Sequence, residues 1–401
     1  MRTGFFFFTE PLLRNCQGRG FERFASAPTQ QVNRYVRRQV DTDALRSDFR
    51  QHRVYLFTCL LVYCLLVSAF PFFRVYIPSA IISFMILITG ATGFIGRAVV
   101  RQLSAIGYPL RTLIRPSPRT PKLPKGVPVE VAVVSLADVR GLRAALRDVD
   151  TIIHLASAEN QGSRGDLLVA DIQGTENLVE AASDAGVDRI VYLSHIGAAR
   201  ASGYPAFKAK GIAEEHIRNG KVPYTILRTS LVYGAEDHFT NNLSRIIRSS
   251  FGVFPIPSGG RTVVQPVWVE DLVTCMLWSL ENEDTLNQVY EVGGTEFFTL
   301  QQIIETIMEV THRQRYLVPL SPITLRALTV FFEGVVPNFP ISSFWLDYFA
   351  VNRTCAIDSL PRIFGLMPAR FSYRLDYLIR KSWVQRAWNT VTERIASLRP
   401  R

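Results

Sequence analysis

The sequence predicts an α/β fold built on a doubly wound parallel sheet, and three observations support this prediction. Strand-like and helix-like segments alternate from residue 85 to about residue 235, which is typical of right-handed βαβ units. A glycine-rich loop directly follows the first apolar strand and opens the first helix. Hydrophobic residues make up 48% of the chain and charged residues 20%, a balance that is typical of a folded protein.

Each predicted element follows from its own residue pattern. Short apolar runs predict strands at residues 85–89, 110–114, 129–134, 151–155, 189–194 and 224–229. Apolar residues at helical spacing predict helices at residues 94–106, 136–147, 167–185 and 204–219. Gly107, Gly186 and Gly220 follow three of these helices as C-terminal caps. Beyond residue 235 the pattern is mixed, which indicates a second, smaller lobe.

The loop after the first strand reads Thr-Gly-Ala-Thr-Gly-Phe-Ile-Gly, beginning at Thr89. Its glycines allow a tight turn and a close approach of the backbone to a ligand, while the following helix offers free N–H groups and the positive end of its dipole. This strand–turn–helix context predicts a site for the pyrophosphate of a dinucleotide. The residues expected to contact the nucleotide are Gly90, Thr92, Gly93, Phe94, Ile95, Gly96, Leu155 and Ala156.

Several further stretches accompany this loop. They are DTIIHLA at residues 150–156, GTENL at 174–178, RTSLVYG at 228–234, QPVWVED at 265–271 and YEVGG at 290–294. Together with the loop they resemble the extended and atypical short-chain dehydrogenase/reductases, which are NAD(P)-binding Rossmann proteins related to NAD-dependent epimerases and dehydratases. Within that group the chain looks most like the branch containing the nucleotide-binding accessory subunit of respiratory complex I. The resemblance covers roughly residues 85–310.

Composition and the resemblance together divide the chain into four parts. We expect a basic, then hydrophobic extension over residues 1–84, an NAD(P)-binding Rossmann domain over 85–235, a substrate lobe interleaved with it over 236–379, and a basic amphipathic tail over 380–401. Residues 54–73 carry no charge and are long enough to span a bilayer, yet a single span would export a domain built for a cytosolic dinucleotide. The alternative is that Met85 begins the protein and that the first 84 residues are an optional or mis-assigned extension.

The residues after the second strand decide between NAD and NADP. An acid there binds the ribose hydroxyls of NAD, whereas a base accommodates the 2′-phosphate of NADP. This chain has Arg115 and no acid in that position, and Arg119 or Arg97 is available to assist. The alternative is a solvated basic loop. We expect NADP(H) to be favoured over NAD(H).

The resemblance implies a catalytic set of tyrosine, lysine and serine, which Tyr204, Lys208 and Ser194 match. Positions i and i+4 of a helix share one face, so Lys208 would lower the pKa of the Tyr204 phenol, which would exchange a proton with the substrate oxygen. Ser194 would orient that oxygen. Only ten residues separate Ser194 from Tyr204, and Pro205 requires the helix to begin there, so the alternative is an ordinary surface tyrosine.

The resemblance also draws attention to three other positions. Asp171 stands where relatives often carry asparagine, which weakens any argument for a proton relay there. Ser135 stands where many relatives carry the acid that contacts adenine, so we expect looser adenine contacts. His195 follows a buried strand, where a lone histidine is more often a structural hydrogen-bonding group than a catalytic base.

Two functions fit this set of motifs. The first is an NADPH-dependent oxidoreductase, or an epimerase or dehydratase, acting on a small or lipophilic carbonyl compound. The second is a non-catalytic NADPH-binding sensor or assembly subunit of a membrane complex. The five cysteines and six histidines form no metal-ligand spacing, and no nucleic-acid-binding motif is present.

The expected location is the cytoplasm, with contact to the cytoplasmic face of a membrane as a further possibility. The apolar, aromatic segment 322–350 predicts either a lid or core of the second lobe, or a lipophilic tunnel or membrane-facing surface. The tail 380–401 repeats apolar residues at helical spacing between arginines, and such a helix lies on an anionic membrane or packs on its own domain.

Overall fold

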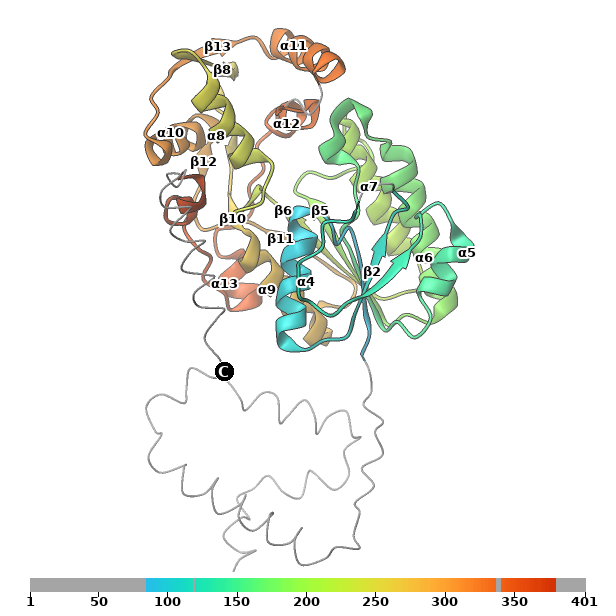
Figure 1. Cartoon of the computed structure of the whole chain (residues 1–401). Coiled ribbons are helices and arrows are strands. Elements are labelled where there is room, and N and C mark those ends of the chain that lie inside the picture. The colour runs from blue at the N-terminus through green and yellow to red at the C-terminus, as the bar shows by residue number, and fades with distance from the viewer. Residues whose placement is uncertain (1–83, 118–119, 337–339, 380–401) are drawn as a thin grey trace, which may run out of the picture. The chain divides into compact units, whose positions relative to one another are not determined.

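The computed structural model describes residues 84–117, 120–336 and 340–379. Its centre is a sheet of seven parallel strands in the order β11–β6–β5–β4–β1–β2–β3 (Figure 1). In chain order the strands are β1 (Ile86–Thr89), β2 (Leu110–Ile114), β3 (Glu130–Val133), β4 (Thr151–His154), β5 (Arg189–His195), β6 (Tyr224–Thr229) and β11 (Gln288–Val292). The strand order reverses between β1 and β4, which is where doubly wound sheets bind their ligands. The predicted α/β fold is confirmed.

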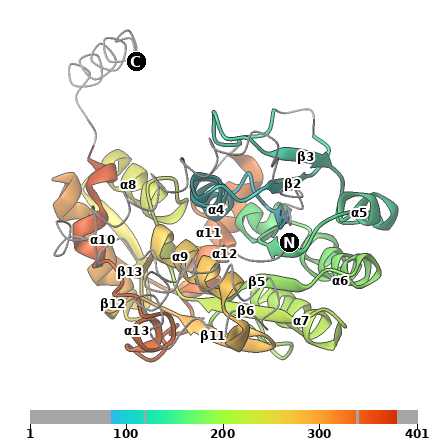
Figure 2. The ribbon, with the colours of Figure 1, turned by 90° about the horizontal axis from the view of Figure 1, so that it is seen from below.

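Helices cover both faces of this sheet. They are α4 (Phe94–Ile106), α5 (Val139–Ala145), α6 (Gly174–Ala185), α7 (Pro205–Asn219) and α9 (Val269–Glu281). Ile86 and Ile88 of β1 pack with α4 and α9, whereas Leu87 between them packs with α5, α6 and α7. Figure 2 shows these two helix layers on opposite sides of the sheet. A strand that is apolar on both faces is what a parallel sheet between two helix layers requires.

Three predicted helices differ in detail from the observed ones. The predicted helix 136–147 is shorter in the structure because Asp138 takes the N-cap position of α5 and accepts the Gly141 N–H at 3.0 Å. The predicted helix 167–185 is a π-helical turn, Leu168–Gln173, that continues into α6. Tyr204 precedes α7 as its N-cap residue, because Pro205 occupies the first helical position.

The second lobe is assembled from the chain after residue 235. Its main elements are α8 (Phe239–Ser249), β8 (Val253–Pro257), α10 (Leu300–Thr311), β13 (Tyr316–Leu320), α11 (Pro322–Val335) and α12 (Ser343–Tyr348). β8 and β13 pair in parallel, and α8 packs on α10. This lobe lies above the carboxyl ends of the central strands in Figure 1. Between its parts the chain returns to the sheet through α9 and β11, the latter pairing with β6.

Some of the sequence predictions fall on residues outside those described. The extension up to residue 83, with its apolar run 54–73, the tail 380–401 and Arg119 are all in this group. Among the described residues, no helix is both long enough and apolar enough to cross a bilayer.

Candidate nucleotide-binding site

The phosphate loop turns sharply between β1 and α4, and two glycines make the turn possible. Gly90 has a φ of +71°, and a Cβ atom there would lie 2.7 Å from the backbone of Leu155 and Ala156. Gly96 lies under the turn, where a Cβ atom would collide with the Gly90 carbonyl oxygen. The loop is therefore held against the end of β4 by backbone packing that larger residues would prevent.

The N-terminus of α4 has the features that an anion requires. Gly93 occupies the N-cap position with an extended backbone, and no side chain caps the helix. No acidic side chain lies in the first turn, so nothing there offsets the positive end of the helix dipole. The first N–H groups of a helix have no intrahelical partner, and a pyrophosphate satisfies them. The loop fits the predicted nucleotide, while its individual contacts stay a prediction.

Thr89 fastens this loop to β4 through a buried hydrogen-bond network. Its hydroxyl accepts the N–H groups of Leu155 at 3.1 Å and Ala156 at 3.2 Å, and lies 2.6 Å from Nδ1 of His154. The His154 Nε2 atom lies 2.9 Å from the Thr175 hydroxyl on α6. Burial lowers the pKa of His154 to about 3, so the ring is neutral near pH 7. The network then assigns the acceptor role to Nδ1 and the donor role to Nε2.

Arg115 lies directly after β2, at the carboxyl edge of the sheet. Its side chain is exposed, and it joins no ion pair within the described part of the chain. Arg97 is engaged instead, because it donates to Glu236 at 2.5 Å and to the Thr92 carbonyl at 2.5 Å. Of these two predicted phosphate-binding arginines, Arg115 is the one whose charge is available.

The predicted catalytic residues do not converge on one point. Ser194 is fully buried, and its hydroxyl donates to the Glu214 carboxylate at 2.6 Å. Tyr204 packs on the core of the second lobe, whereas Lys208 is exposed. The Lys208 backbone N–H donates to the Tyr204 carbonyl at 2.9 Å, as expected for positions four apart, but the two side chains differ in burial. Within the described residues no hydrogen bond joins the three side chains, and their use in catalysis stays a prediction.

Lys210 is the buried lysine of α7, and sequence reasoning missed it. Its side chain is only 4% exposed, and its Nζ atom donates to the Leu193 carbonyl at 3.3 Å and lies 3.7 Å from Oδ1 of Asp171. The helical spacing held the signal that could have found it. The buried stripe of α7 contains Ala206, Lys210, Ala213, Glu214 and Ile217. Lys208 lies off that stripe, and the residue four before Lys210 is an alanine.

Glu159 and His195 join Lys210 and Asp171 in one group of ionisable side chains, the Lys210 cluster. Glu159 Oε2 lies 2.9 Å from Nε2 of His195. Burial opposes the ionisation of Glu159, but His195 and Lys210 outweigh it and lower the pKa of Glu159 to about 2. Burial also opposes the charge on Lys210, yet Tyr192, Glu159 and Asp171 raise its pKa. At neutral pH the cluster therefore holds a cationic lysine beside an ionised glutamate.

Aromatic side chains fill the space beyond the end of β5. The ring centroid of His195 lies 5.6 Å from that of Phe207, 6.0 Å from that of Phe344 and 5.8 Å from that of Tyr348. The Arg353 guanidinium lies 3.4 Å from the Phe207 centroid and donates to the Tyr348 carbonyl at 3.0 Å. Residues of α12 therefore pack directly on the strand end that carries His195.

The second lobe contains a separate apolar cavity of about 70 Å³. Its walls come from α8, β8, α10, α11, α12 and nearby loops, and include Phe239, Phe254, Ile304, Leu325 and Trp345. None of its lining residues belongs to the phosphate loop or to the Lys210 cluster. The apolar segment 322–350 thus contributes to the core of the lobe through α12, while α11 forms part of its surface.

The fold and the open phosphate loop define a class of protein, and comparison with known proteins agrees. Residues 90–242 match the NAD(P)H-binding protein family. Residues 90–242 are thus an NAD(P)H-binding segment, and they lie on the parallel Rossmann-like sheet that the motifs implied.

Its curated relatives include subunits and assembly factors. The chain is 28% identical over 274 residues to NADH dehydrogenase (ubiquinone) 1 alpha subcomplex subunit 9, mitochondrial, of Arabidopsis thaliana, covering 66% of this chain and 68% of the relative. The Rattus norvegicus protein of the same name is 26% identical, with 56% and 60% covered. Photosystem II assembly factor Ycf39 of Synechocystis is 23% identical over 307 residues, with 73% and 89% covered. The chain thus spans 60 to 68% of these two complex I subunits.

Solved structures of epimerases share the fold. An epimerase from Methanothermobacter thermautotrophicus superposes with a TM-score of 0.59 at 19% identity, covering 78% of this chain and 95% of the epimerase. UDP-glucose 4-epimerase from Thermotoga maritima gives a TM-score of 0.56 at 20% identity, with 77% and 99% covered. At this identity the likeness concerns the fold alone.

Proposed function

We propose that this chain binds NADP(H) as a sensing or structural ligand and serves as a subunit or assembly factor of a membrane complex, without catalysing hydride transfer. The environment of Lys210 is the observation that carries this proposal. That lysine is enclosed with Asp171 and Glu159, and the residue four positions before it is Ala206. A phenol that faces the substrate beside such a lysine would exchange a proton with a carbonyl group. The phenol beside Lys210 is instead that of Tyr192, whose ring centroid lies 5.1 Å from Nζ; it is buried, and burial raises its pKa, so it does not face a substrate.

The hydrogen bonding of Ser194 supports the same proposal. Its hydroxyl is already donated to Glu214, and that carboxylate also accepts two hydrogen bonds from Arg228, at 3.0 and 2.6 Å. A buried serine held by an ion pair stabilises the contact of α7 with β5 and β6. It leaves no hydroxyl hydrogen for the oxygen of a substrate.

NADP(H) is the nucleotide that we propose, because Arg115 offers an exposed guanidinium after β2. Arg97 cannot take this role without leaving Glu236 and the Thr92 carbonyl. A guanidinium binds a phosphate through two parallel hydrogen bonds, which adds both energy and orientation. NADH lacks that phosphate, so its affinity should not depend on Arg115.

The proposed partner is a membrane complex at the cytoplasmic face of its membrane. Two relatives support this class of partner, since one is named as a subunit of NADH dehydrogenase and another as an assembly factor of photosystem II. The packing of α12 on the end of β5 supports it as well, because a filled strand end suits a binding protein better than an enzyme with a mobile substrate.

Titration calorimetry on the full chain tests the nucleotide. We expect NADPH to bind roughly ten- to one-hundredfold more tightly than NADH, the range expected for hydrogen bonds to a charged group. Arg115→Ala should remove this preference and leave NADH binding unchanged. Arg140→Ala is the matched control, because Arg140 is also exposed and joins no described ion pair. Equal affinity for both nucleotides in the unmodified protein would contradict the proposed selectivity.

Turnover and partner assays test the rest of the proposal. NADPH incubated with the protein and a panel of aldehydes and ketones should be recovered unoxidised. The protein should migrate with a large complex when membranes of its source are separated by native electrophoresis. Turnover that disappears in Tyr204→Phe would overturn the proposal in favour of an NADPH-dependent oxidoreductase.

A further inference from the structure

The helix α11 is oriented with polar residues inward. Its buried residues are Leu325, Thr329 and Glu333, which recur every fourth position. The Glu333 carboxylate accepts the Ser343 N–H at 3.1 Å, and Arg326 pairs with Asp347 of α12. Polar contacts therefore fasten the inner face of α11, in contrast to the apolar inner face of an ordinary surface helix.

The outer face of α11 is hydrophobic. Ile323 is 81% exposed, Phe331 61% and Val335 64%. The other exposed apolar side chains of this helix and the residue after it are Leu328, Val330, Phe332 and Val336. β8 and β13 lie at the same end of the molecule (Figure 1), where Tyr316 is 82% exposed and Phe251, just before β8, is fully exposed. Large apolar side chains exposed together at one end of a molecule mark an interaction site.

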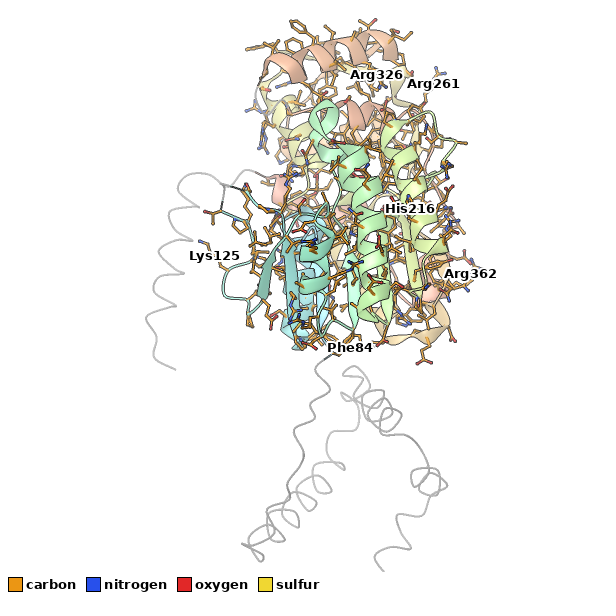
Figure 3. All side chains as sticks on the ribbon, turned by 90° about the vertical axis from the view of Figure 1, so that its right-hand side faces the viewer. Phe84, Lys125, His216, Arg261, Arg326 and Arg362 are labelled. Atoms are coloured by element: carbon orange, nitrogen blue, oxygen red, sulfur yellow. The ribbon has the colours of Figure 1, made fainter. Side chains whose placement is uncertain are left out.

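Arginines outnumber acids in the two segments that carry the apolar surface, although α10 bears the exposed Glu305 and Glu309, and Asp347 neutralises Arg326. Residues 240–269 and 311–346 contain six arginines and a single acid, Glu333, whose side chain is buried. Arg261 and Arg313 are exposed and join no ion pair within the described residues. Figure 3 labels Arg261 and Arg326 at the same end of the molecule. Large aromatic and aliphatic side chains flanked by arginines are the combination that binds an anionic membrane surface.

We infer that this end of the second lobe docks on an anionic phospholipid bilayer. α11 lies in the plane of the interface, with Phe331 and Val335 entering the acyl boundary and Arg261 and Arg313 contacting headgroup phosphates. The polar contacts to α12 hold the helix while its apolar face is in lipid. The inference rests on the proposed function only for its placement at a membrane, and bare lipid vesicles test it without nucleotide or protein complex.

Vesicle flotation with the full-length protein is the test. We expect binding to phosphatidylcholine vesicles that contain phosphatidylglycerol, little binding to phosphatidylcholine alone, and release by salt. The pair Phe331→Ser with Val335→Ser should lower the partition coefficient about tenfold, because two inserted side chains are lost. The pair Arg261→Glu with Arg313→Glu should lower it by at least about fivefold per arginine.

Matched variants show whether a loss of vesicle binding comes from this surface or from another change in the protein. Val133→Ser changes an exposed apolar side chain on β3 and should leave flotation unchanged. NADPH affinity, measured on every variant, shows that the nucleotide domain remains folded. Flotation equal to that of the unmodified protein in the α11 variant would overturn the inference. A second outcome would also overturn it. If analytical ultracentrifugation shows that the unmodified protein is a dimer and the α11 variant is not, while flotation is unchanged, the surface binds a second copy of the chain.

Discussion

At the scale of single residues, the nucleotide site depends on positions that have no room for a side chain. A Cβ atom on Gly96 would collide with the backbone of Gly90 and Ala91. We expect Gly96→Ala to weaken NADPH binding at least about tenfold and to lower the melting temperature, because the turn must shift, at a cost of about 1–3 kcal/mol. Calorimetry and thermal denaturation measure both effects. Gly203→Ala is the control, since nothing lies within 4 Å of a Cβ atom there, and equal effects of the two substitutions would refute the explanation.

A second residue-scale prediction concerns pH. Burial lowers the pKa of His154 to about 3 in the folded protein from its ordinary value of 6.5, so the unfolded chain takes up a proton first as the pH falls. This histidine therefore makes no pH-dependent contribution above 6.5, and the free energy of unfolding decreases as the pH falls from 6.5 towards 3, by up to about 1.4 kcal/mol per unit.

Urea unfolding of the unmodified protein and of His154→Gln, at pH values above and below 6.5, measures this contribution. The variant should be less stable at neutral pH, because the Thr89 network is broken, but should lose less stability on acidification. Identical pH slopes for the two proteins would show that His154 is not the group responsible.

At the scale of elements, two adjacent glutamates of α7 allow a matched comparison. Glu214 is fully buried and bound by Ser194, Arg218 and Arg228, whereas Glu215 is partly exposed and pairs with the exposed Arg200. Glu214→Gln should lower the free energy of unfolding by about 1.5–3 kcal/mol, because the buried side chain loses its charge-assisted hydrogen bonds to the partly exposed Arg218 and Arg228. Glu215→Gln should lower it by less than about 1 kcal/mol. Urea denaturation distinguishes the two, and a small effect at Glu214 would contradict the role given to this ion pair.

At the scale of the whole molecule, the two lobes are joined by more than the covalent chain. β11 pairs with β6 in the central sheet, and Arg353 donates to the Ile196 carbonyl just beyond β5 at 2.7 Å while its own carbonyl accepts from Ser230 at 2.8 Å. We expect one cooperative thermal transition. NADPH at about one hundred times its dissociation constant should stabilise it by about 2.7 kcal/mol.

Circular dichroism and tryptophan fluorescence give two views of that transition. Trp268 and Trp345 pack on the core of the second lobe and Trp278 on the core of the central sheet, whereas the dichroism reports on all the helices and strands. Coincident curves that move together with NADPH are the expected result. A second transition that nucleotide leaves in place would show that the lobes unfold independently.

The predicted fold was largely recoverable from sequence because its signals are local. β2, β6 and α4 have their predicted bounds, and the four other predicted strands differ from prediction by only one or two residues. Each follows from a short apolar run or a glycine cap that does not depend on distant residues. The buried lysine of α7 was not recoverable in this way. The tyrosine–lysine spacing suggested Lys208, whereas the lysine on the buried stripe of α7 is Lys210. A motif spacing alone carries no information about which helix face is buried.

The sequence by itself determined the parallel sheet, the phosphate loop after β1 and the arginine after β2. Strand period, glycine position and residue charge are properties of contiguous residues. Only the tertiary structure decided that Ser194 serves Glu214, that His195 and Glu159 enclose Lys210, and that α11 turns its apolar face outward. These depend on partners 20 or more residues apart in the chain, or on which side of a helix the rest of the fold covers. Burial and pairing are set by packing across the molecule, so hydrophobicity along the chain does not determine them.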